Sequence, residues 1–172
     1  MSRARMTAAV VLSPRPGAAL GSTARALLTA TAPVWLPAGA LAAVSALLGW
    51  LLPTVLTVSL LLLLASVLVH EAGHVAALRV LAPATPAVFR VDATGAGVCR
   101  PPLADTRREV AVVLAGPLAP AVVWTLGTAL GAAAGGVPAA AVVWTGIVAL
   151  GHPVSLLFPV GDTRTLLRAL TR

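Results

Sequence analysis

Four long apolar segments constrain the fold of this 172-residue chain more than any other feature. They run from about Trp35 to Leu52, Thr54 to Val80, Val110 to Leu130 and Val137 to Phe158. A helix needs about 20 mostly apolar residues to cross the hydrocarbon core of a bilayer. Only 10% of the residues are charged, against about 25% in ordinary globular domains. The sequence therefore predicts an all-α membrane protein with about four transmembrane helices. The lipid bilayer is its expected surrounding and partner.

The arginines between these segments predict the orientation of the helices. Four arginines precede the first segment, five lie between Arg79 and Glu109 against three acidic residues, and three follow the last segment. The short connections "GWLLPT" and "GAAAGGVP" carry no charge. Because cytoplasmic loops are enriched in basic residues, we expect a multi-pass protein of the plasma (inner) membrane. Both termini and the middle loop are expected in the cytoplasm.

The net charge of +7 does not indicate a nucleic-acid partner. All of the basic residues are arginines, and they form three clusters between apolar segments. No aromatic residues are interleaved with them to stack on bases. The single cysteine, Cys99, excludes an internal disulfide.

The remaining segments predict a tail and a small surface element. Residues 1–32 are expected to form a mobile cytoplasmic tail, and residues 33–172 a single transmembrane domain. Pro33 and Pro37 would lie at the start of the first helix, where proline is tolerated. The middle loop contains "AVFRVDATGAGVCR", in which two short alternating stretches flank a glycine-containing turn. This pattern predicts either a short β-hairpin at the membrane surface or an irregular loop.

Residues 70–74, "HEAGH", place two histidines and a glutamate inside the second apolar segment. Residues four apart lie on one face of a helix, so His70 and His74 can hold one Zn²⁺. Glu71 lies about 100° around the axis and can act on water as general base and then as proton donor. Ala72 and Gly73 leave room for close approach of a helix or substrate. Ionisable groups within a membrane are costly, which favours a metal site over a chance match or a buried polar pair.

Asp162 is the best-placed third ligand. A catalytic zinc usually takes three protein ligands and leaves a fourth position for water. Asp162 follows the fourth segment, where Pro159 and Gly161 are expected to break the helix, on the same side of the bilayer as His74. The alternative is that Asp162 caps a helix from Thr163 to Leu170.

His152 precedes Asp162 by ten residues. In a helix this separation corresponds to about 15 Å along the axis, too far to share the metal unless the segment unwinds. A structural or substrate-contacting role is therefore expected for His152, which is also a candidate for stabilising an oxyanion.

Three motifs resemble the site-2 protease family of intramembrane zinc metalloproteases. They are "HEAGH" at the end of a membrane helix, "LAGPLAP" opening a later one and "PVGD" after the last. The resemblance covers Val55 to about Leu167 and implies a metalloprotease-like domain with a three-helix core that water reaches from the cytoplasm. It implies zinc bound by His70, His74 and Asp162, with Glu71 as the catalytic acid and base.

The resemblance also implies the reaction, which is hydrolysis of a peptide bond in or near the transmembrane segment of a membrane-protein substrate. The middle hairpin resembles strands with which the family pairs unwound substrate. Three positions depart from the family pattern. Thr163 replaces the usual glycine, Pro120 replaces an asparagine after "GPLA", and an upstream asparagine is missing, with Ser155 as the nearest small polar residue.

Two rival functions remain open at this stage. One is a catalytically weak or inactive family member that binds membrane helices. The other is a metal carrier, which is ranked lower because the extracytoplasmic halves of the segments have almost no polar residues.

Overall fold

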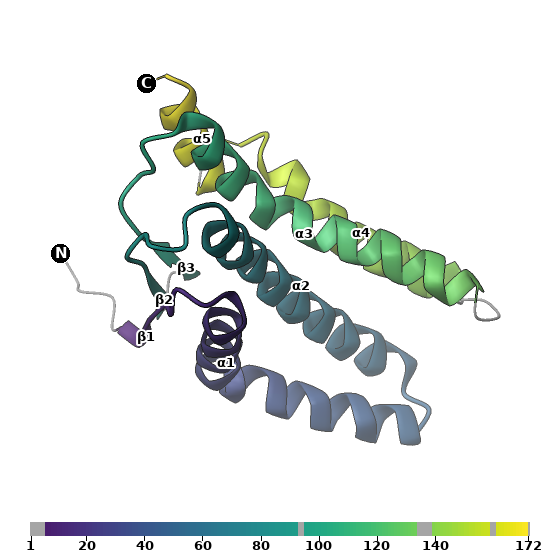
Figure 1. Ribbon diagram of the computed structural model, residues 1–172. Helices are drawn as coiled ribbons and strands as arrows, with labels where there is room; N and C mark the ends of the chain where they lie inside the picture. The colour runs from purple at the N-terminus through teal and green to yellow at the C-terminus, as the bar shows by residue number, and fades with distance from the viewer. Residues whose placement is uncertain (1–5, 93–94, 134–138, 159–160, 172) are drawn as a thin grey trace.

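The computed structural model describes residues 6–92, 95–133, 139–158 and 161–171. Its elements in chain order are β1 (Met6–Val11), α1 (Pro16–Leu47), α2 (Leu51–Leu81), β2 (Val88–Asp92), β3 (Gly95–Cys99), α3 (Thr106–Ala133), α4 (Ala139–Ser155) and α5 (Asp162–Leu170). Helices α1 to α4 run between the two ends of an elongated bundle (Figure 1). The three strands and α5 lie at one end, where α2 finishes and α3 starts.

Three helices of the described chain, α1, α2 and α3, are long and apolar enough to cross a membrane. Helices α2 and α3 confirm the second and third predicted segments, with small shifts at their ends. Helix α4 has 17 residues and is shorter. The chain thus has the helices of a membrane protein, and a count of four spans stays a prediction. Residues 134–138 of the connection "GAAAGGVP" lie outside the described residues.

The N-terminal region differs from the tail that the sequence predicted. Residues 6–11 form β1, and α1 already begins at Pro16, so Pro33 and Pro37 lie inside this helix. The reason is packing: α1 buries a stripe of mostly small residues with helical spacing, namely Ala19, Thr23, Ala26 and the larger Leu27. Helix α1 also ends earlier than predicted, at Leu47, and Leu51 and Leu52 belong to α2. Arg3 and Arg5, which belong to the predicted tail, lie outside the described residues.

The middle loop forms the predicted hairpin, and the N-terminal strand extends it. Strands β1, β2 and β3 make one antiparallel sheet in that order. In β2 the buried side chains of Phe89 and Val91 alternate with the exposed Arg90, as the two-residue period of a strand requires. Residues 93–94, where the turn was predicted, lie outside the described residues. Strand β1 was not predicted.

The core lies where α1, α2 and the sheet meet, and includes the fully buried Val75, Leu78 and Phe89. Arg79 is 2% exposed beside this core. Its guanidinium donates to the backbone carbonyls of Leu12 at 3.1 Å, Pro83 at 3.1 Å and Thr85 at 2.7 Å. One side chain therefore joins the end of α2 to the segment between β1 and α1.

Candidate metal centre

Small residues bring α2 and α3 into close contact at the "HEAGH" sequence. A Cβ added to Gly73 would lie 2.7 Å from Ala119 Cβ and 3.0 Å from the carbonyl carbon of Ala115. A Cβ added to Gly116 would overlap the imidazole ring of His74. The expectation that Gly73 admits a neighbouring helix is confirmed. The "LAGPLAP" sequence supplies the facing surface of α3, and its glycine makes room for a histidine ring.

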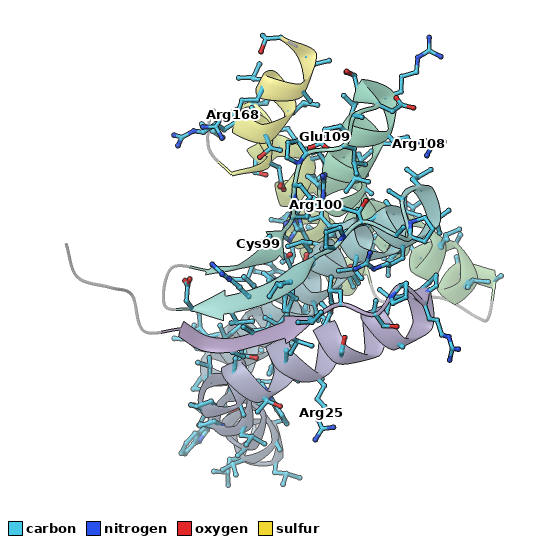
Figure 2. The ribbon with its side chains drawn as sticks, turned by 60° about the vertical axis from the view of Figure 1, so that its left-hand side comes forward. Arg25, Cys99, Arg100, Arg108, Glu109 and Arg168 are labelled. Carbon is cyan, nitrogen blue, oxygen red and sulfur yellow. The ribbon has the colours of Figure 1, made fainter. Side chains whose placement is uncertain are left out.

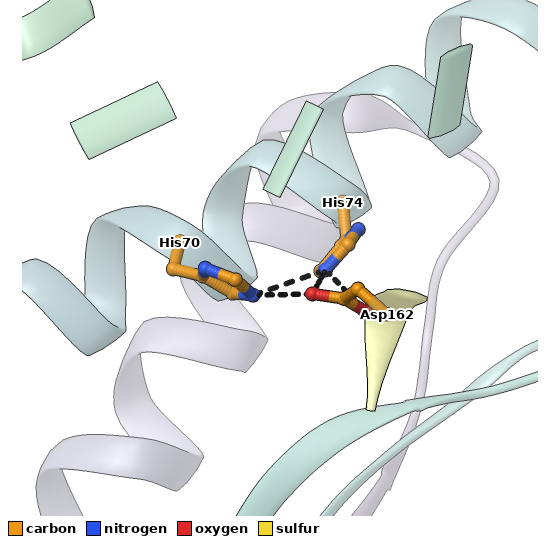
Figure 3. A group of neighbouring side chains, drawn as sticks. All are labelled: His70, His74 and Asp162. Atoms are coloured by element: carbon orange, nitrogen blue, oxygen red, sulfur yellow. Dashed lines mark hydrogen bonds and ion pairs between the residues drawn. The ribbon is translucent and has the colours of Figure 1, made fainter. Parts of the chain in front are cut away.

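The three residues predicted as ligands converge (Figure 3). His70 Nε2 lies 3.2 Å from His74 Nε2 and 3.0 Å from Asp162 Oδ2, and His74 Nε2 lies 3.3 Å from Asp162 Oδ2. Ligands placed tetrahedrally around Zn²⁺ at 2.0–2.1 Å lie roughly 3.3 Å from one another. The spacing of these three atoms therefore fits one face of a zinc tetrahedron, and leaves the fourth corner for water or substrate.

The backbone of α3 sets the tautomer of His74. The Nδ1–H of His74 donates to the carbonyl oxygen of Val112 at 2.8 Å. A neutral imidazole has one N–H and one lone pair, so the lone pair of Nε2 faces His70 and Asp162. This is the outer hydrogen bond that metal-binding histidines commonly make.

Asp162 is the first residue of α5, and its carboxylate turns toward the histidines instead of capping the helix. Gly161 precedes the helix with φ of 52°, and no side chain caps it. The capping alternative for Asp162 is therefore wrong. Burial acts to raise the pKa of the Asp162 carboxyl, but the close contacts with His70 and His74 outweigh burial and hold the pKa below its ordinary value. This carboxylate is thus anionic beside the two imidazoles.

Thr163 follows Asp162 and contacts the end of α4. Its side chain is buried, at 8% exposure. The hydroxyl donates to the carbonyl oxygen of Ser155 at 3.4 Å, from the start of α5 to the end of α4. The hydroxyl of Ser155 in turn donates to the carbonyl oxygen of His152 at 2.6 Å. The first of these bonds joins the start of α5 to the end of α4.

Glu71 borders the same cavity as the ligand cluster without belonging to it. The cavity has a volume of about 730 Å³ and is bounded by α2, β3, α3 and α5. Glu71 is 6% exposed, and its Oε2 is buried without a hydrogen-bond partner among the described residues. The ligand group of the described chain contains His70, His74 and Asp162. A largely buried carboxylate that lines a polar cavity beside the cluster suits a group that exchanges protons with water.

Comparisons of the chain with protein-family models, curated proteins and solved structures give no match. The similarity to site-2 proteases therefore stays a prediction based on three motifs. The chemistry of the site has to be derived from its own residues.

One wall of the cavity holds an ion pair that sequence reasoning missed. Arg100 Nη1 lies 2.8 Å from Glu109 Oε2, with side-chain exposures of 9% and 6%. The backbone N–H of Leu103 donates to the same oxygen at 2.8 Å. Figure 2 shows this pair between the end of β3 and the start of α3, close to Cys99. Arg100 follows β3 and lies nine residues before Glu109, which is in the first turn of α3, and no local sequence pattern indicates this pairing.

His152 lies next to the cluster, contrary to the distance estimated along a continuous helix. Its ring centroid is 4.8 Å from that of His70, with the ring planes inclined by 41°. The estimate assumed one continuous helix, whereas α4 ends at Ser155 and α5 begins at Asp162. Both His152 and Asp162 therefore approach His70, from opposite ends of the same connection.

Proposed function

We propose that this chain is an intramembrane zinc metalloprotease, which hydrolyses a peptide bond in or near the transmembrane segment of a membrane-protein substrate. The observation that carries the proposal is the convergence of two imidazole nitrogens and a carboxylate oxygen within 3.0–3.3 Å of one another. These are electron-pair donors, and they repel unless a cation or protons lie between them. The lone pair that Val112 imposes on His74 Nε2 favours a metal ion.

The donor set suits a catalytic zinc. Two histidines and one carboxylate are a usual ligand set for hydrolytic zinc, with one position left open. A zinc ion held there supplies Lewis acidity, which acidifies a water molecule and polarises a carbonyl group. The residues His70, His74 and Asp162 would hold it, and the 730 Å³ cavity gives water and a peptide access to it.

Glu71 carries the proton transfers of the proposed reaction. Its carboxylate removes a proton from the water molecule that attacks the scissile carbonyl carbon. A C–O bond forms, the C–N bond of the peptide breaks, and the leaving nitrogen receives the same proton from Glu71. Glu71 is only 6% exposed, which limits contact between its carboxylate and bulk water.

The position of the site suits a substrate from the membrane. The ligand histidines lie in α2, one of three helices able to span a bilayer, and the cavity opens beside β3. A helical substrate has to unwind before its backbone is accessible. Residues 96–99 of β3 line the cavity, and this edge strand suits pairing with an unwound peptide. Positive charge at the sheet end of the bundle supports a cytoplasmic location for this end and both termini.

The first experiment measures zinc in detergent-purified protein after chelation and reloading. We expect about one zinc ion per chain for wild type, and loss of zinc for His70→Ala and Asp162→Ala. Asp105→Asn is the matched control, because Asp105 is 52% exposed and lies at the start of α3. Folded wild-type protein that binds no zinc would overturn the proposal.

The second experiment separates a protease from an inactive helix-binding protein. A single-span reporter with a Gly-Pro pair in its membrane helix is incubated with zinc-loaded protein in liposomes. Glu71→Gln is expected to keep the zinc and to lower cleavage by about 10²–10⁴-fold. Reporter that binds to zinc-loaded wild type without being cut would favour the helix-binding alternative.

A further inference from the structure

His152 is the one polar side chain of α4 that contacts the ligand cluster among the described residues. The rest of the helix, "AAAVVWTGIVALGHPVS", is almost entirely apolar. The His152 ring packs at 4.8 Å from the ring of His70 without a hydrogen bond to it. It does not belong to the ligand group. Its position beside a ligand therefore calls for a different explanation from metal binding.

The ring nitrogens of His152 have no hydrogen-bond partner within the part of the chain that the structure describes. A neutral imidazole always carries one N–H donor, and the His152 ring is only partly buried, so this donor is accessible to a bound molecule. The backbone at this position is held in place, because the Ser155 hydroxyl donates to the carbonyl oxygen of His152 at 2.6 Å. A ring that packs against His70 and keeps a free donor suits a ligand that arrives from outside the chain.

Two hollows lie close to the contact between the rings of His70 and His152. An apolar cleft of about 330 Å³ lies between α2, α3 and α4, and Val69 and Ala149 line it. Val69 directly precedes His70, and Ala149 lies one helical turn before His152. The polar cavity with the metal ligands begins at His70. The His152 ring lies 4.8 Å from the ring of His70, so an extended peptide that runs from the apolar cleft to His70 comes close to it.

We propose that the imidazole N–H of His152 donates a hydrogen bond to the carbonyl oxygen of the peptide bond that is cut, a role that rests on the proposed function. Negative charge grows on this oxygen as water adds to the carbonyl carbon. A donor already held in position in a site poor in water stabilises such charge strongly. His152 thus complements Glu71: one residue moves the proton, and the other holds the oxygen.

Acetohydroxamate tests this role without a substrate, because its carbonyl oxygen imitates the scissile carbonyl beside the metal. The protein is loaded with Co²⁺, and the visible absorption of cobalt reports both metal binding and acetohydroxamate binding. We expect His152→Ala to leave the cobalt affinity within about twofold of wild type and to weaken acetohydroxamate about tenfold, the size of a hydrogen bond to a charged group. His152→Gln, which retains an N–H donor, should restore most of the affinity. Gly151→Ala is the control, since its added methyl meets nothing within 4 Å.

Three results would overturn the inference, and they are distinguishable. Equal acetohydroxamate affinity in wild type and in cobalt-loaded His152→Ala would exclude the donor role while leaving the metal site intact. A fall in cobalt affinity of about tenfold or more in His152→Ala would instead make His152 a support for the metal ligands, such as a partner for the unpaired His70 Nδ1. Wild-type protein that binds no cobalt would remove the proposed function and this role together.

Discussion

The contact between Gly116 and His74 leads to a quantitative prediction for Gly116→Ala. The added Cβ would lie 2.5 Å from His74 Cδ2 and would also overlap two further ring atoms, including Nε2. Ordinary van der Waals contacts are 3.4–4 Å, so the ring has to move by about 1 Å. Gly116 lies within α3, and the helix cannot move away easily because Gly73 already touches Ala115.

A shift of this size disrupts two interactions at once. The hydrogen bond from His74 Nδ1 to Val112, now 2.8 Å, would exceed hydrogen-bonding distance, and Nε2 would leave its position 3.2 Å from His70 Nε2. Loss of an outer hydrogen bond alone usually costs about 10–100-fold in metal affinity. Helix propensity acts in the opposite direction, because alanine is favoured over glycine by about 0.5–1 kcal/mol in a helix. Weaker zinc binding would therefore identify the steric effect.

Competition with a chromogenic chelator measures this change. We expect the zinc dissociation constant of Gly116→Ala to rise by about 10–100-fold. Gly127→Ala is a matched control in the same helix, because its added methyl meets nothing within 4 Å, and it should bind zinc like wild type. If Gly116→Ala also bound zinc like wild type, the proposed placement of His74 as a ligand against α3 would be refuted.

Three further outcomes are expected. Arg79→Met removes the donors to three carbonyls and should destabilise the protein by about 3 kcal/mol. Thermal unfolding measures this change, with Arg25→Met at an exposed site as the control. Equal unfolding midpoints for the two variants would contradict the prediction. Arg100→Met leaves Glu109 without its buried ion pair and should cost about 3–5 kcal/mol. In the same assay, Arg108→Met, at a side chain that is 58% exposed, should change stability by less than about 1 kcal/mol, and the reverse order would refute the burial argument. Cys99 is exposed and lines the cavity. A maleimide should therefore label it in native protein as completely as in denatured protein. Protection of Cys99 from labelling in the native protein would show that the cavity is closed.

The sequence predicted α2, α3 and the ligand cluster because the signals there are local or rest on rare residues. Long apolar runs identify both helices whatever their neighbours. His70 and His74 lie on one helix face by spacing alone, and the chain offers few acids from which to choose Asp162. The structure brings these three side chains together, whereas the bound metal and the enzymatic activity stay predictions.

The N-terminal region and the outer residues of the site were not predictable in this way. The buried stripe of α1 consists largely of alanine and threonine, such as Ala19 and Thr23, which differ little in hydropathy from the rest of that segment. Strand β1 depends on a partner about 80 residues away. His152 was misplaced because a distance along a straight helix ignores the turn between α4 and α5. Local patterns do not contain these contacts between distant segments.

The pairing of β1 with β2 also determines the order in which the sheet can form during synthesis. Met6 pairs with Asp92, whereas β2 and β3 are neighbours in the chain. At about 5–20 residues per second, the ribosome needs several seconds after making β1 to deliver its partner. The hydrogen bond from Arg79 to the carbonyl oxygen of Leu12 can form only after a similar delay. The first strand to be synthesised is thus among the last to be placed, and until then β2 presents an unpaired edge.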